Sequence, residues 1–188
     1  MGFTLVETLI ALFIFSLSVV VVMAVLSTGI SGTTYARNKV IATYLAQEGI
    51  EYFRNMRDTS MLYTDDKKGW NNFIVKLEEG RCNIQNGLGC WFDNEIYKSC
   101  EEPLCSVPEM PIMKITVKAC SEKCPALLYN NGAYGYHAGE NSVFTRKISF
   151  KSLSETDEEI KIFSEVSWNQ QGRNSTVLLS ENLSAWIE

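Results

Sequence analysis

The chain opens with a long apolar stretch and then turns polar. From Thr8 to Ala36 there is no Asp, Glu, Lys, Arg or His. About 20 apolar residues are enough to cross the hydrocarbon core of a bilayer as a helix. A cleaved secretory signal has a shorter apolar core and a small-residue cleavage site, and a buried core helix is neither this long nor this uniformly apolar. The pattern therefore predicts a retained membrane anchor.

The following segment, "YARNKVIATYLAQEGIEYFRNMRD", continues the helix with an amphipathic pattern. Its apolar residues recur at spacings of three, four and seven, as on one face of a helix. We expect these residues to face a core: Ile41, Tyr44, Leu45, Tyr52, Phe53 and Met56. Gly49 weakens the helix locally by about 1 kcal/mol. The prediction is one helix over residues 3–57, with a membrane half (3–36) and an amphipathic half (37–57).

The remainder, residues 58–188, is predicted to be a soluble domain that ends in strands. Residues 58–111 are rich in turn formers, with a short helix expected around Trp70 to Leu77. Apolar and polar residues then alternate in "PIMKITVKA", "VFTRKISF" and "EIKIFSEVSW", as in half-buried strands. The last segment, "STVLLSENLSAWIE", begins as a strand and is expected to end in a helical turn. The fold class is therefore α+β, with a long helix packed on one face of an antiparallel sheet.

Charge adds little to this description. The chain has 22 acidic and 17 basic residues and a net charge of −5. Such a chain has no general attraction to nucleic acid or anionic lipid, and its lysines and arginines are scattered among acidic residues. We therefore predict no nucleic-acid partner.

The six cysteines form a local cluster within the polar part of the chain. An even, clustered set is typical of a disulfide framework in an oxidising compartment. Proximity suggests three bridges, and other connectivities stay open: Cys82–Cys90, Cys100–Cys105 and Cys120–Cys124. The alternative is a zinc site formed by the last four cysteines, whose spacing fits a metal site loosely. We favour the disulfides and predict no metal or cofactor.

Two signals disagree about the side of the membrane on which the domain lies. Arg37 and Lys39 follow the apolar run and no basic residue precedes it. The positive-inside rule would then place the domain in the cytoplasm. The cysteines indicate an oxidising compartment, and we expect an extracytoplasmic domain.

No catalytic set is visible in the sequence. His137 is the only histidine, within "NNGAYGYHAGEN", and no nucleophile and base can be assigned around it. The aromatic and glycine-rich stretch is more typical of a surface loop. An enzyme is therefore not predicted.

Glu7 is the one carboxylate at the edge of the apolar run. A charge in the bilayer is costly, and a helix N-terminus offsets part of that cost. If the chain were cut between Gly2 and Phe3, the new α-amine would carry a positive charge. That amine could pair with Glu7 of the same helix or of a neighbouring subunit. Pairing between subunits would favour assembly.

The segment "GFTLVETLIALFIF" resembles the class III signal of type IV pilins and pseudopilins. The segments "LAQEGIEYFRNMRD" and "FTRKISF…EIKIFSEVSW…STVLLSENLSAW" resemble minor pilins of the type IV pilus modification group. The resemblance implies a pilin-like fold, cleavage after Gly2 by a prepilin peptidase, and N-methylation of Phe3. Residues 1–2 would then be a leader remnant. Members of the family carry a basic leader before this glycine, whereas in this sequence only Met1 precedes Gly2.

The resemblance also implies a location and partners. The precursor would be a single-pass protein of the cytoplasmic membrane, and the processed chain would join or initiate a cell-surface filament with other pilin subunits through its N-terminal helix. Glu7 would be the assembly residue. The alternative function is a monomeric, membrane-anchored binding or adhesin domain that does not polymerise.

Overall fold

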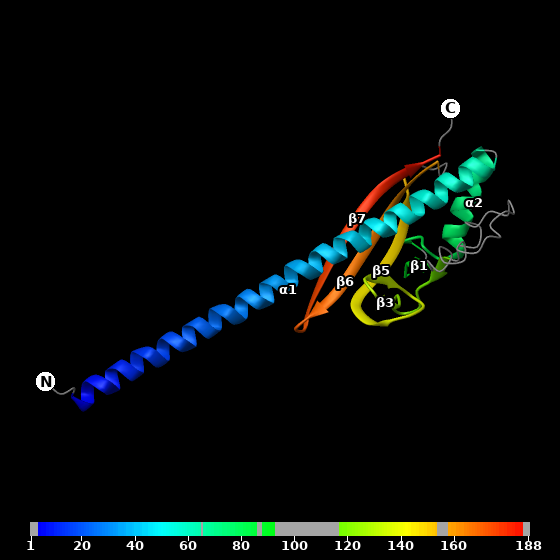
Figure 1. Cartoon of the computed structure of the whole chain (residues 1–188). Helices are drawn as coiled ribbons and strands as arrows, with labels where there is room; N and C mark the ends of the chain where they lie inside the picture. The colour runs from blue at the N-terminus through cyan, green and yellow to red at the C-terminus, as the bar shows by residue number, and fades with distance from the viewer. Residues whose placement is uncertain (1–3, 65, 86–87, 93–116, 154–157, 186–188) are drawn as a thin grey trace. The chain divides into compact units, whose positions relative to one another are not determined.

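The computed structural model describes residues 4–64, 66–85, 88–92, 117–153 and 158–185 (Figure 1). The chain divides into two units, Met1–Val40 and Ile41–Glu188. Helix α1 (Leu5–Tyr63) supplies the described part of the first unit and the first element of the second. It continues six residues beyond the predicted end at residue 57. The reason lies in packing, because Thr59 and Met61 are buried within the second unit.

The second helix is longer than the sequence pattern indicated. It spans Asp66–Glu79, and we expected residues 70–77. Its buried positions follow helical spacing: Trp70, Phe73, Ile74 and Leu77. Gly69 allows α2 to approach α1 closely, because a Cβ there would lie 2.4 Å from the carbonyl oxygen of Ser60.

Seven strands of the described chain form one sheet in which all the strand pairings are antiparallel. They are β1 (Cys90–Phe92), β2 (Val117–Ala119), β3 (Ala126–Asn130), β4 (Ala133–Gly135), β5 (Glu140–Ser152), β6 (Glu159–Gln170) and β7 (Arg173–Ser184). The three long strands β5, β6 and β7 lie side by side in chain order (Figure 1). β5 also pairs with β1 and β3, which pair in turn with β2 and β4.

The alternating pattern of the long strands is confirmed by their burial. The apolar residues expected on one face are buried: Phe144, Ile148 and Phe150 on β5, and Ile160, Ile162, Val166 and Trp168 on β6. Gln171 and Gly172 connect β6 to β7 with positive φ angles, as a tight hairpin turn requires. Of the strand expected within 111–119, only β2 is among the described residues.

The last strand begins as the sequence pattern predicted. β7 keeps its register with β6 as far as the pair Glu159–Ser184. Leu183 is buried in the core at a strand position. The helical turn expected at the end of this segment falls on residues that include 186–188, which lie outside the described residues.

Two hydrophobic clusters join α1 to the sheet within the second unit. The larger one contains Tyr52, Phe53 and Met56 of α1 with residues of α2, β1, β5, β6 and β7. The smaller one contains Ala42, Leu45 and Ala46 with residues of β3, β5 and β6. Ile41 is half-buried and packs against the smaller cluster, whereas one predicted core position differs, because Tyr44 is 68% exposed. Small residues take its place, because the helix backbone lies close to the sheet at Ala42, Ala46 and Gly49.

Candidate assembly site

The first turn of α1 is built around Thr4 and Glu7. Helix α1 begins at Leu5, so Thr4 is the N-cap residue. The backbone N–H of Glu7 donates to the Thr4 carbonyl oxygen at 3.1 Å and lies 3.3 Å from the Thr4 hydroxyl. Glu7 is exposed in this first turn, where the helix dipole favours a negative charge. Gly2 and Phe3, the predicted cleavage and methylation residues, lie outside the described residues.

The N-cap was a signal that our sequence interpretation missed. A Thr followed three residues later by Glu is the spacing of a capping box. The structure places Thr4 in this role and Glu7 at the third helical position. Glu7 therefore has a local structural setting besides any role in pairing with a second chain.

The apolar segment after Glu7 is uncovered by its own chain. Every side chain from Thr4 to Ile30 is exposed. Among the described residues, one helix is long and apolar enough to cross a membrane, and none of its apolar window is buried. The segment is therefore compatible with a single membrane span.

Six hydroxyl groups in this half of α1 are bonded to the helix itself. They donate to a backbone carbonyl three or four residues earlier: Thr8, Ser16, Ser18, Thr28, Thr33 and Thr34. In lipid no water is present to satisfy such groups. Because these hydroxyl groups are already hydrogen-bonded to the helix, they need no water and are compatible with an apolar environment.

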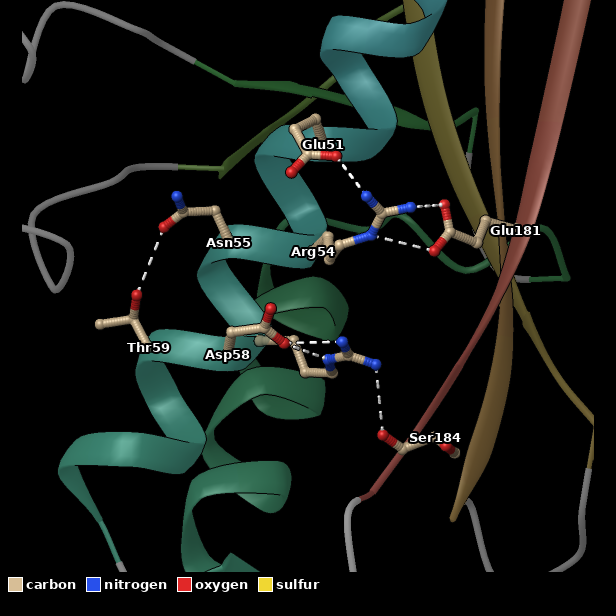
Figure 2. A network of polar contacts seen from close by, with 8 residues as sticks. Glu51, Arg54, Asn55, Asp58, Thr59, Glu181 and Ser184 are labelled. Atoms are coloured by element: carbon tan, nitrogen blue, oxygen red, sulfur yellow. Dashed lines mark hydrogen bonds and ion pairs between the residues drawn. The ribbon is translucent and has the colours of Figure 1, made fainter.

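Two arginines fasten the second half of α1 to β7 (Figure 2). Arg54 donates from Nε and Nη2 to the two carboxylate oxygens of Glu181, and from Nη1 to Glu51. One turn later, Arg57 pairs with Asp58 and lies 3.5 Å from the Ser184 carbonyl oxygen. The forked Arg–carboxylate pair fixes the angle between helix and strand as well as their separation.

The hydrogen bond with Glu181 raises the pKa of the Arg54 guanidinium, and partial burial lowers it to a smaller extent. A raised pKa means that the stabilisation is complete below the ordinary arginine pKa and is lost only as the pH rises above it. Titration of Arg54 therefore does not change the stability of the domain across the physiological pH range.

Arg146 is a third cation, and sequence reasoning did not single it out as a core residue. Its side chain is 1% exposed on β5, where the alternation places it facing α1. Its Nη1 donates to Glu48 at 2.8 Å and to the Leu45 carbonyl oxygen at 3.2 Å. The guanidinium carbon lies 4.2 Å from the Phe92 ring centroid, a favourable cation–π arrangement. The sequence did contain one signal for this burial, because Arg146 lies on the same face of the alternating strand as Phe144 and Ile148.

Two of the three disulfides suggested by proximity are present. Cys82–Cys90 and Cys120–Cys124 are bonded, while Cys100 and Cys105 lie outside the described residues. The alternative zinc site is contradicted in this form, because Cys120 and Cys124 are bonded to each other and cannot both be thiolate ligands. Within the described ranges, no group of three His, Cys, Asp or Glu side chains is placed to hold a metal.

The remaining candidate, His137, lies in the exposed turn between β4 and β5. No family model, curated protein or solved structure matches the chain. The proposed function therefore rests on the chain's own residues and on the resemblance of its N-terminal segment.

Proposed function

We propose that this chain is a minor pilin or pseudopilin, made as a membrane-anchored precursor, processed by a prepilin peptidase and assembled into, or initiating, a type IV pilus-like filament. The observation that carries the proposal is the segment "GFTLVE" at the head of an apolar helix that its own chain leaves uncovered. An exposed apolar helix requires lipid or other helices around it. A filament core of similar helices would supply the second environment after the membrane supplied the first.

The carboxylate of Glu7 would determine how neighbouring helices align along the filament axis. Cleavage after Gly2 would create a positively charged amine on Phe3, four residues before Glu7. In a medium of low dielectric constant, an unpaired carboxylate is costly and a nearby ammonium group offsets much of that cost. Pairing between the amine of one subunit and Glu7 of its neighbour would favour one axial stagger of the helices.

The disulfides support an extracytoplasmic position for the sheet domain. Bonded cysteines persist in oxidising compartments and are rare in the cytosol. Two bridges in the described part of the domain agree with export. The basic residues Arg37 and Lys39 would then flank the membrane on its outer side.

One observation favours the alternative, a monomeric anchored binding domain. The backbone N–H of Glu7 bonds to the N-cap Thr4, so Glu7 lies in the first helical turn, where the helix dipole favours its negative charge without a second subunit. Processing separates the two functions, because only a pilin precursor has a reason to lose its first two residues.

The experiment is the mass of the mature chain in wild type and in a Gly2→Trp variant. We expect the wild-type chain to begin at N-methylated Phe3 and the variant to retain Met1 and its new second residue. A Thr8→Val variant, altered within the span but outside the cleavage site, is the control and should be processed normally. Identical N-termini in wild type and the Gly2→Trp variant would refute the assignment as a pilin precursor.

A further inference from the structure

Strand β7 forms a long outer edge of the sheet. Its twelve residues pair with β6 from Gln170–Arg173 to Glu159–Ser184 without a register shift. Among the described residues β7 pairs with β6 alone. The other outer strands described, β2 and β4, have only three residues each.

The central part of the β7 edge lacks the features that usually protect an outer strand, and the charged residues Arg173 and Glu181 lie outside this part. Natural sheets guard long edges with proline, bulges or charged residues. The central segment Ser175–Ser180, "STVLLS", has no proline and no charge, and Leu178 is 57% exposed. Such an uncharged segment of high β-propensity recruits another strand.

A groove runs beside this strand and provides room for a second chain. It has a volume of about 600 Å³ and is walled by Tyr44, Gln47 and Glu51 of α1 and by Leu179 and Ser180 of β7. The aromatic ring of Tyr44 is 68% exposed among polar positions of α1. A side chain of an added strand could pack on this ring.

The charges of the groove indicate which side chains would fit. Three of its residues are carboxylates, Glu48, Glu51 and Glu181, and two guanidiniums pair with them, Arg54 in the groove and the buried Arg146, so the carboxylates outnumber the cations by one. Arg146 holds Glu48 from the buried side, and Arg54 holds Glu181 in a forked pair. The acidic groups are thus fixed in position beside the open edge and would favour a cationic partner.

We propose that β7 is a docking edge to which an extended, lysine- or arginine-bearing segment of another protein chain adds as a further strand. The added segment would pair its backbone with β7, and its cationic side chains would enter the groove toward Glu51 and Glu48. This mode gives affinity through main-chain hydrogen bonds and specificity through alternate side chains. The inference goes beyond the proposed function, because strand addition requires neither cleavage after Gly2 nor a filament.

The test is photo-cross-linking of the full chain in its own membrane. Thr176, Leu178 and Ser180 are replaced one at a time by p-benzoylphenylalanine, and the cross-linked peptides are identified by mass spectrometry. Strand addition predicts that probes two residues apart link to partner residues two residues apart within one basic segment. The control probe replaces Val75, which is exposed on α2 and lies outside the sheet, and should give at least ~10-fold lower yield.

Two charge variants make the outcome decisive. Gln47→Arg, at an exposed position of α1 in the groove, should reduce the cross-link from position 178 by at least ~10-fold, whereas Gln47→Glu should retain it, with the thermal midpoint of both variants unchanged. A regular register on a basic segment of another protein supports the inference. Links without register, equal yield from position 75, links only to a second copy of this chain, or equal effects of both charge variants would overturn it.

Discussion

At the scale of the residue, variants of Thr4 and Glu7 distinguish two roles for the Glu7 carboxylate: pairing with a neighbouring subunit and stabilising the first turn of α1. If Glu7 pairs with the amine of a neighbouring subunit, Glu7→Gln should reduce incorporation into filaments by at least ~10-fold, because about 1.4 kcal/mol of lost pairing corresponds to that factor. Thr4→Ala keeps the charge and removes the N-cap hydroxyl, at about 1 kcal/mol of helix stability. Immunoblots of purified filaments and membranes measure both.

The Thr4→Ala variant is the matched control for this prediction. It should enter filaments at close to the wild-type level, and the Glu7→Gln variant should remain in the membrane at its normal amount. If both variants lose incorporation equally, capping rather than pairing explains Glu7.

Gly49 is a second residue whose role the structure defines. A Cβ at this position would lie 2.5 Å from Ser164 Oγ and 3.0 Å from Ile148 Cδ1. We expect Gly49→Ala to destabilise the domain by about 1–3 kcal/mol, because an overpacked interface must shift. The free energy of unfolding of the full chain in mild detergent measures the change.

The double variant Gly49→Ala/Ser164→Ala tests the cause of that loss. Ser164 Oγ is buried without a hydrogen-bond partner among the described residues, so Ser164→Ala alone should cost little or stabilise. Removing the hydroxyl should recover part of the Gly49→Ala loss. Strictly additive effects would show that the contact between Gly49 and Ser164 is not the source.

At the scale of the element, the ion pairs made by α1 differ in their expected contributions to stability. Glu48 is the counter-charge of the buried Arg146 on β5, whereas Glu51 pairs with the partly exposed Arg54 within α1 itself. Glu48→Gln should therefore cost about 2 kcal/mol, because a hydrogen bond between charged groups is lost and a buried cation keeps no carboxylate partner. Glu51→Gln on the same helix should cost at most about 0.5 kcal/mol.

Thermal unfolding of both glutamine variants provides the comparison. A larger loss for Glu51→Gln than for Glu48→Gln would contradict the assignment of Arg146 and Glu48 as the main charged contact between α1 and β5.

The bridge Cys82–Cys90 connects the end of α2 to β1. Both cysteines are fully buried, and the bridge closes a short loop beside the larger hydrophobic cluster. Cys82→Ala/Cys90→Ala should reduce the free energy of unfolding by about 2–3 kcal/mol. Peptide mapping without reductant should recover Cys82 linked to Cys90, and Cys120 linked to Cys124.

Alkylation of the denatured, unreduced chain supplies the control, because these four cysteines should not react. Free thiols at Cys82 and Cys90, or a bridge from either one to another cysteine, would contradict this arrangement of the domain.

At the scale of the whole molecule, the sequence predicted the elements that have a clear period. The apolar run predicted α1, and the alternation at Ile160, Ile162 and Val166 predicted β6. The short spacing between cysteines predicted two of the disulfide bridges. The close approach at Gly49 and the burial of Arg146 were not predicted. Both depend on residues distant in the chain, Ser164 for the glycine and Glu48 for the arginine, and a local pattern does not contain these contacts. Thr4 is different, because its capping spacing with Glu7 could have been identified from the sequence.

The most direct test of the central claim is the N-terminal mass of this chain recovered from purified surface filaments. The account predicts that the chain is present there, begins at Phe3 with a methylated amine, and carries its cysteines as disulfides. A chain that keeps Met1 and Gly2 and is confined to the membrane would contradict it.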